Sequence, residues 1–105
     1  MPELKQNPTL ADFQKYVIEL EEERGFSSQN VLDKCLLLGE EIGELFKAVR
    51  KSRKLTIDIN SDFTSVSEEL ADILIYICAI ANRLDIDLEQ AFRQKEDINM
   101  KREWV

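Results

Sequence analysis

Apolar side chains recur every three or four positions along four stretches of this sequence, and this spacing constrains the fold more than any other feature. It is the repeat of an α-helix that buries one face. The chain has only three glycines and two prolines, the residues that most readily interrupt a helix, so its helices can be long. Its 105 residues suit one small domain. We therefore predict an all-α fold in which residues 1–105 form a single domain, a four-helix bundle.

The expected helix ends follow from residues that start or stop a helix locally. Thr9 and Ser65 are each placed to accept a backbone hydrogen bond at a helix start, and Ser65 with Glu68 matches a capping box. Gly25 is the residue type that most easily takes the left-handed conformation at a helix end. The helical pattern breaks between residues 54 and 64, where we expect a loop. The predicted helices cover residues 10–24, 28–53, 66–84 and 88–101.

The net charge and one missing residue type exclude several functions. The net charge is −7, so the chain is poorly suited to bind nucleic acid or an anionic membrane surface, and we expect neither partner. The sequence has no histidine, which excludes a Ser-His-Asp triad, a Cys-His pair, a histidine-ligated zinc ion and a histidine general base. The same absence disfavours a di-iron bundle built on Glu-x-x-His.

The two cysteines indicate a reducing compartment. Cys35 and Cys78 each lie in an apolar helical stretch, and their spacing fits neither a zinc site nor a redox pair. We expect both to be buried thiols. The first residues show no signal peptide, and the longest apolar run, residues 73–81, is too short to span a bilayer. These features predict a cytoplasmic protein.

Two acidic clusters with the same spacing occur on the second and third predicted helices. In each, a pair of glutamates is followed three positions later by another carboxylate. Residues three apart lie on the same face of a helix. The apolar stripes place two acids of each cluster inward and one outward. The inward carboxylates are Glu41, Glu44, Glu69 and Asp72, and the outward ones are Glu40 and Glu68.

Four inward carboxylates need a cation, because a buried carboxylate without a partner is costly and would take up a proton. No lysine or arginine occupies the inward stripe of either helix within reach. A hard divalent cation with oxygen ligands answers this need, and Mg²⁺ suits the site best because it takes few carboxylates and bridges to substrate phosphates. We predict Mg²⁺, with Mn²⁺ as a substitute. The competing interpretation is a solvated acidic face on surface helices.

Polar residues near the C-terminus are candidates for phosphate binding. Lys95, Asn99 and Arg102 follow one another at helical spacing and continue the stripe that carries Leu88 and Phe92. We expect this face to turn toward the bundle, where the two cations would neutralise phosphate oxygens. A solvated helix end explains the same pattern equally well.

The third predicted helix is apolar around nearly its whole circumference. Its main stripe carries Leu70, Leu74 and Ile77, while Ile75 and Ala79 lie on the opposite side. A single bundle covers only part of such a helix, and soluble monomers rarely expose the rest. We expect the chain to form a homo-oligomer, most simply through a two-fold interface.

Three segments together resemble one protein family. They are LLLGEEIGELFKAV at residues 36–49, EELADILIYICAIA at 68–81 and KEDINMKR at 95–102. Two paired acidic motifs followed by Lys-x-x-x-Asn-x-x-Arg make the chain similar to the MazG-like all-α nucleoside triphosphate pyrophosphohydrolases. The resemblance implies a four-helix core that assembles as a dimer or tetramer. Its implied catalytic metal ligands are Glu41, Glu44, Glu69 and Asp72, and its implied phosphate or sugar contacts are Lys95, Asn99 and Arg102.

The resemblance also implies a reaction. The expected activity is magnesium-dependent hydrolysis of a nucleoside or deoxynucleoside triphosphate between the α and β phosphates, often to clear non-standard or surplus nucleotides. The metal would lower the pKa of the attacking water, and Glu40, Glu41 or Glu68 would accept its proton. Two alternatives stay open: a pyrophosphohydrolase of a non-nucleotide phosphoribosyl compound, and a non-catalytic acidic helical partner protein.

One position departs from the family pattern. Close relatives often carry a tyrosine one residue after the arginine of the last motif, where this chain has Glu103 followed by Trp104. We expect the Trp104 indole to bind substrate by stacking on a base, although a plain packing role fits as well. The first predicted helix matches the family less well, which leaves the preferred base open.

Overall fold

The computed structural model describes residues 1–53 and 65–104, and within them the chain forms four α-helices. They are α1 (Leu10–Arg24), α2 (Val31–Ser52), α3 (Val66–Arg83) and α4 (Leu88–Met100). These residues contain no strand, which confirms the predicted all-α class. The loop expected at 54–64 lies outside the described residues. None of the four helices is long and apolar enough to cross a membrane.

Local capping residues determine the helix ends, as the sequence predicts. Thr9 Oγ1 accepts a hydrogen bond from the Asp12 N–H at 3.2 Å, and the Asp12 carboxylate accepts one from the Thr9 N–H at 2.8 Å. Gly25 ends α1 in the left-handed conformation, with φ of 76°. Ser65 Oγ accepts from the Glu68 N–H at 3.1 Å, which is the first half of the predicted capping box.

The second helix begins later than predicted. Its N-cap is Asn30 rather than a residue near Ser28. The Asn30 side chain accepts from the Asp33 N–H at 2.8 Å, and the Asp33 carboxylate accepts from the Asn30 N–H at 3.0 Å. This reciprocal pair stabilises the helix start at Asn30, because it satisfies two backbone donors that would otherwise lack a partner.

The buried face of α2 also differs from the one that helical spacing predicts, an apolar stripe that carries Cys35 and Phe46. Lys34 and Ala48 are buried, whereas Phe46 is 64% exposed. Cys35 is exposed, so the prediction of a buried thiol is wrong there and confirmed only for Cys78. Apolar residues occur on two sides of this helix, and their spacing alone does not show which side packs within the chain.

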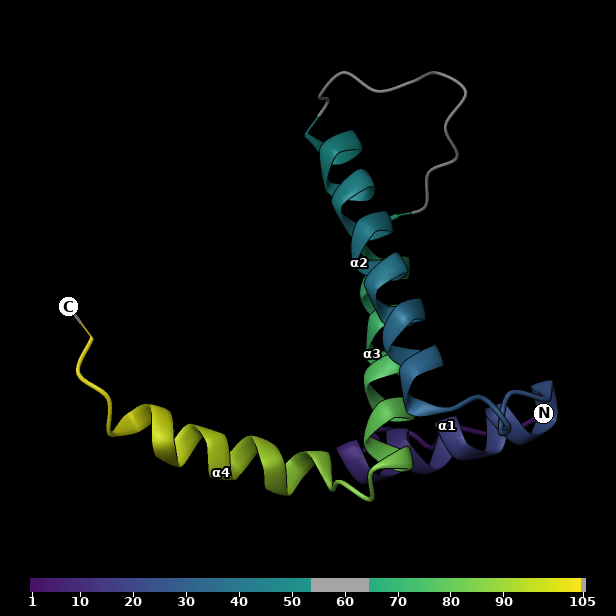
Figure 1. Ribbon diagram of the computed structural model, residues 1–105, viewed down its shortest axis with the longest axis horizontal. Coiled ribbons are helices and arrows are strands. Elements are labelled where there is room, and N and C mark those ends of the chain that lie inside the picture. Colours follow the sequence, from purple (N-terminus) through teal and green to yellow (C-terminus); the bar gives the residue numbers. More distant parts are fainter. Residues whose placement is uncertain (54–64, 105) are drawn as a thin grey trace.

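Two helices lie side by side and a third crosses their base. α2 and α3 pack along each other in opposite directions, and α1 packs across α3 (Figure 1). The core between α1 and α3 contains Val17, Leu20, Cys78 and Ala79. Ile75 packs against this core, so α1 covers the side of α3 that carries Ile75 and Ala79. The expectation that a second chain is needed to cover this side is therefore wrong.

α4 does not fold back onto α2 and α3, so one chain has an open arrangement instead of the predicted closed bundle. It packs against α1 and then runs away from the other helices (Figure 1). The Gln14 side chain of α1 holds its first turn, because it accepts from the Leu88 N–H at 3.0 Å and donates to the Ile86 carbonyl at 2.7 Å. Asp85, just before this point, takes a left-handed conformation with φ of 54°. The turn between α3 and α4 thus directs α4 outward.

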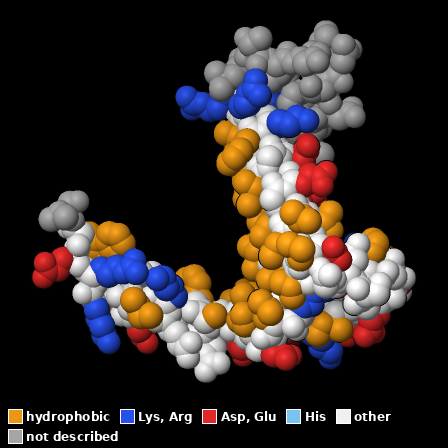
Figure 2. Space-filling model, in the orientation of Figure 1, with side chains coloured by type: hydrophobic (Ala, Val, Ile, Leu, Met, Phe, Trp, Pro, Cys, Tyr) orange, Lys and Arg blue, Asp and Glu red, His pale blue; other side chains and the backbone are white. Residues whose placement is uncertain are grey.

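Large apolar side chains remain exposed on the pair formed by α2 and α3. Figure 2 shows apolar side chains gathered along the edge of this pair from which α4 extends. We call Leu32, Leu36 and Phe46 the exposed apolar face of α2, because they share one side of the helix and are 64% to 66% exposed. Leu70 of α3 is 53% exposed and Phe92 of α4 is 67% exposed. A single chain therefore leaves part of its apolar surface uncovered.

Candidate metal centre

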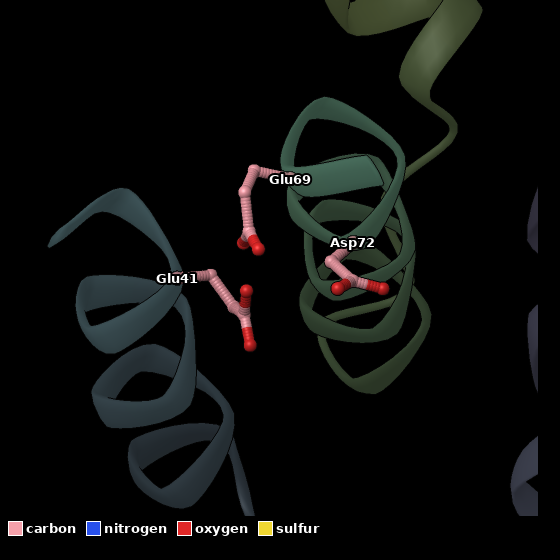
Figure 3. Close-up of side chains that lie close together, drawn as sticks. All are labelled: Glu41, Glu69 and Asp72. Atoms are coloured by element: carbon pink, nitrogen blue, oxygen red, sulfur yellow. The ribbon is translucent and has the colours of Figure 1, made fainter. Parts of the chain in front are cut away.

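Three carboxylates from two helices meet where α2 packs against α3. α2 contributes Glu41, and α3 contributes Glu69 and Asp72, which are one turn apart. Each offers one carboxylate oxygen, and the three oxygens lie within 4.8 Å of one another. Figure 3 shows the Glu41 and Glu69 side chains pointing toward each other, with Asp72 beside them. The structure thus brings together three of the four predicted metal ligands.

The surroundings of two members of this cluster raise the pKa of their carboxyl groups. The pKa of Glu41 is raised from its ordinary value of 4.5 to about 7 by a hydrogen bond with Glu69, by burial and by nearby carboxylate charges. The pKa of Asp72 is raised by burial and then by the charges of Glu69 and Glu68. A cation bound here would stabilise the ionised form of all three carboxylates, so the site favours one.

The donor set of the cluster fits a hard divalent cation. All three donors are carboxylate oxygens, the ligand type that Mg²⁺ and Ca²⁺ prefer. Mg²⁺ keeps several waters and needs only a few carboxylates, so three suffice and leave positions for phosphate oxygens.

The fourth predicted ligand, Glu44, lies outside this group of three. Its carboxylate forms an ion pair with Lys47 Nζ at 3.7 Å, and its side chain is 39% exposed. Its charge nevertheless contributes to the raised pKa of Glu41, after the hydrogen bond with Glu69 and burial. Glu40 and Glu68 are exposed, as the helical phase predicts.

A buried ion cluster lies close to the carboxylates, and the sequence analysis missed it. Lys34 Nζ lies 3.2 Å from Glu21 Oε2, and Arg83 binds both Glu21 oxygens at 2.9 and 2.6 Å. Burial by itself would raise the pKa of Glu21, but hydrogen bonds from Arg83 and Lys34 hold it below its ordinary value. The expectation of no cation on the inward stripe of α2 is therefore wrong. Lys34 pairs with Glu21 of α1, and spacing within α2 gives no sign of that contact.

The predicted phosphate-binding residues do not join the cluster within one chain. Lys95 and Arg102 are exposed on and just after α4, and Trp104 is 76% exposed. The Asn99 side chain donates a hydrogen bond to Glu96 at 2.8 Å. The expectation that this face turns toward α2 and α3 is wrong for a single chain, because α4 leaves in another direction (Figure 1).

The family comparison covers most of the chain. Residues 29–102 match the model of the MazG nucleotide pyrophosphohydrolase domain. This range contains α2, α3 and α4, together with every predicted site residue except Trp104. The match confirms the family resemblance found in the sequence.

Individual relatives and solved structures agree with this match. The curated relatives named dCTP pyrophosphatase 1 from Mus musculus and Homo sapiens are 32% and 33% identical over 100 and 102 residues. Each alignment covers 90% of this chain but only 59% of the relative, so the chain spans about three fifths of their length. Two crystal structures of iMazG from Vibrio DAT 722 have TM-scores of 0.67 and identities of 31% and 30%. They match 87% and 88% of this chain and 93% and 98% of their own.

Proposed function

The chain belongs to the MazG nucleotide pyrophosphohydrolase family, and on that premise we propose that it hydrolyses a nucleoside or deoxynucleoside triphosphate to the monophosphate and pyrophosphate. One observation carries the proposal: the oxygens of Glu41, Glu69 and Asp72 lie within 4.8 Å of one another inside the matched region. The names of the curated relatives make dCTP the first substrate to test.

The proposed cofactor is Mg²⁺, for which Mn²⁺ would substitute. Glu41, Glu69 and Asp72 would hold it, and Glu44 is the nearest candidate for a further ligand. The bound ion would neutralise phosphate charge and lower the pKa of the attacking water. By holding the ion, these carboxylates would orient the phosphates that it binds, so the chain would supply orientation as well as charge.

The proton of the attacking water requires a carboxylate that the metal does not occupy. Glu41 has a raised pKa that suits a base near neutral pH, but the proposal makes it a ligand. Glu40 and Glu68 are exposed beside the ligands. Burial and then nearby carboxylates, Glu40 among them, raise the pKa of Tyr76, which follows the cluster on α3. The charge of Glu68 likewise helps to raise the pKa of Asp72, after burial and the charge of Glu69, so we propose that Glu40 or Glu68 accepts the proton.

The proposed active form is a homo-oligomer, a dimer or a tetramer. The exposed apolar face of α2 needs a partner, since soluble monomers rarely leave such surfaces bare. α4 carries Lys95 and Arg102 away from the acidic cluster of its own chain (Figure 1). In an oligomer, α4 of a second copy would cover apolar surface and bring its basic residues to the phosphates.

A pyrophosphate-release assay tests the reaction. The protein is incubated with millimolar Mg²⁺ and each common ribo- and deoxynucleoside triphosphate, and the products are separated. We expect pyrophosphate and monophosphate in equal amounts for at least one substrate, and no product in EDTA or with Asp72→Asn. Release of orthophosphate would place the cleavage at the wrong bond and contradict the proposal. If none of these nucleotides is hydrolysed, the result would favour one of the two alternatives, a pyrophosphohydrolase of a phosphoribosyl compound or a non-catalytic partner protein.

A further inference from the structure

The exposed apolar face of α2 points away from the rest of its own chain. Its three residues, Leu32, Leu36 and Phe46, are 64% to 66% exposed. They lie on the side of the helix opposite to Glu41, which points toward Glu69 of α3 (Figure 3). Among the described residues, α2 packs chiefly against α3. No described helix therefore covers this face, and an apolar surface of this kind usually marks an interaction site.

The spacing along this face is that of a seam between two packed helices. Its positions follow one another at alternating separations of four and three residues, and they are Leu32, Leu36, Gly39, Gly43 and Phe46. Two helices with this repeat pack along each other with their side chains interlocked. One edge of the seam is also apolar, because Ile42 and Val49 lie there and are 37% and 41% exposed. α2 of a second copy carries the same repeat, so it fits this face.

Two glycines form a notch in the middle of the seam. A Cβ atom added to Gly39 or Gly43 would meet no described atom within 4 Å outside its own helix. Glycine makes a helix less stable than alanine does, so two glycines on one helix face call for an explanation. The distance between two packed helices depends on the side chains at their contact, and facing glycines let the two backbones approach closely. A helix packed at this notch provides that explanation.

We propose that two copies pack through this face, with their α2 helices antiparallel across a two-fold axis at the level of Glu41. Positions at equal distances from Glu41 then meet, so that Leu36 packs against Phe46 and Gly39 against Gly43 of the second copy. Glu41 itself points the opposite way, so the contact leaves the acidic cluster of each copy uncovered. The inference rests on the homo-oligomer of the proposed function, and it specifies the contact surface, the helix direction and the register.

The charged edge of the seam selects this register. Asp33, Glu40 and Lys47 follow one another along that edge at seven-residue spacing. In the proposed register, Asp33 of one copy lies within reach of Lys47 of the other, whose Nζ lies 3.7 Å from Glu44 within its own chain. A shift by half a heptad in one direction brings Asp33 beside Glu40 instead, and a shift in the other direction buries Arg53 in the seam. Charge complementarity therefore favours the axis at Glu41.

Cysteine cross-linking with a short bismaleimide tests the direction and the register together. The exposed Cys35 is first replaced by serine, while the buried Cys78 stays in place. In this background, Ile42→Cys should move most of the protein to twice the chain mass, because the two copies of this residue lie only about 3 Å apart along the helix axis. Val49→Cys, two turns away on the same edge, should stay at the mass of one chain, because its two copies lie about 24 Å apart.

Restoring Cys35 provides the matched control. Cys35 of one copy lies opposite Val49 of the other with the same offset of about 3 Å along the axis, so Val49→Cys should cross-link once Cys35 is present. The native protein should not cross-link, because its two Cys35 thiols lie about 18 Å apart along the axis. No cross-link in Ile42→Cys would overturn the inference. Equal cross-linking of Val49→Cys with and without Cys35 would also overturn it, because parallel helices give that result.

A charge placed in the seam gives a second, independent test. Leu36→Glu, added to the Ile42→Cys protein, should abolish its cross-link, because a carboxylate is costly to bury between two apolar helices. Leu84→Glu is the control, since Leu84 is also exposed but lies at the end of α3. Melting curves should show that both variants fold. A cross-link that persists in Leu36→Glu would overturn the inference. An oligomer that forms without the expected cross-links would contradict this contact and leave the proposed reaction untouched.

Discussion

At the scale of single residues, burial divides the acidic cluster into an inner and an outer part. Glu69 is only 2% exposed, Glu41 is partly buried and Asp72 is exposed. The buried carboxylate has lost most of its hydration, so it depends most strongly on a bound cation or a shared proton. Under the proposed function, the exposed carboxylate is the one that an incoming phosphate and water would meet first.

Replacing a cluster carboxylate by its amide should nearly abolish hydrolysis. We expect Glu41→Gln, Glu69→Gln and Asp72→Asn each to reduce kcat/KM by at least about a hundredfold, or about 2.7 kcal/mol of transition-state stabilisation, because a neutral amide binds Mg²⁺ far more weakly. Glu68→Gln should reduce kcat/KM by a smaller factor, since Glu68 is exposed at the start of α3. Steady-state kinetics decide this, and equal losses at Glu68 and Glu69 would contradict the assigned roles.

Without a metal, the raised pKa of Glu41 should make the protein less stable as the pH rises. A carboxyl group whose pKa is higher in the folded state favours folding while protonated. This contribution is complete below the ordinary value of 4.5 and is lost as the pH passes about 7. Melting curves in EDTA from about pH 5 to about pH 8 should show a falling Tm. The Tm of Glu41→Gln should fall less over this pH range, because an amide does not ionise. Identical slopes of Tm against pH for the two proteins would refute this explanation.

At the scale of helices, the features that could be predicted from the sequence are the local ones. The features that could not be predicted depend on contacts between helices. Thr9 and Gly25 act within one turn of α1, so its ends follow from the sequence alone. The spacing also brought Glu41, Glu69 and Asp72 together, but the prediction that all four carboxylates point inward is wrong for Asp72, which is exposed, and Glu44 lies outside the group. The partner of Lys34 lies on α1, and the direction of α4 depends on the turn at Asp85, so neither follows from helical spacing.

Magnesium should stabilise the contact between α2 and α3. Its ligands come from both helices, and the unfolded chain does not hold them together, so binding favours the folded state by RT ln(1 + [L]/Kd), roughly 1 to 3 kcal/mol well above Kd. Melting curves in EDTA and in millimolar Mg²⁺ should therefore differ, and the difference should vanish in Asp72→Asn. Identical melting temperatures for the native protein in the two buffers would count against a metal site.

The buried ion cluster should be essential for holding α1 against α2 and α3. Glu21→Gln leaves the Lys34 and Arg83 cations buried without their carboxylate and should cost about 3 to 5 kcal/mol of unfolding free energy. The neighbouring Glu22 is exposed, so Glu22→Gln should change stability by no more than about 0.5 kcal/mol. Urea unfolding measures both, and a Glu21→Gln protein as stable as Glu22→Gln would show that the ion cluster contributes little.

At the scale of the whole molecule, one chain is too open for its length. The radius of gyration of the Cα atoms is 16.5 Å, whereas a compact chain of this length has roughly 13 Å. The outward course of α4 accounts for this shape (Figure 1), and it leaves the exposed apolar face of α2 uncovered. Both features support the proposed homo-oligomer, in which another copy would cover this surface.

Light scattering after size exclusion should give a mass of at least twice the 12.2 kDa of one chain. Phe46→Glu places a charge on the exposed apolar face of α2 and should shift the mass toward that of a single chain, because burying the charge in an interface is costly. Ile18→Glu provides the control, since Ile18 is 46% exposed on α1. A native protein with the mass of one chain would rule out the oligomer.

The outward course of α4 also makes this helix a lever. Its 13 residues give it a length of about 20 Å, so a rotation of about 10° at its base displaces its far end by about 3 Å, the length of a hydrogen bond. Gln14 holds only the first turn. The resting place of Arg102 is therefore determined by whatever surface α4 reaches, and hardly by the turn from which it starts. A helix that is held at one end can place its far end over a wide range of positions. Only a contact at the far end fixes that position.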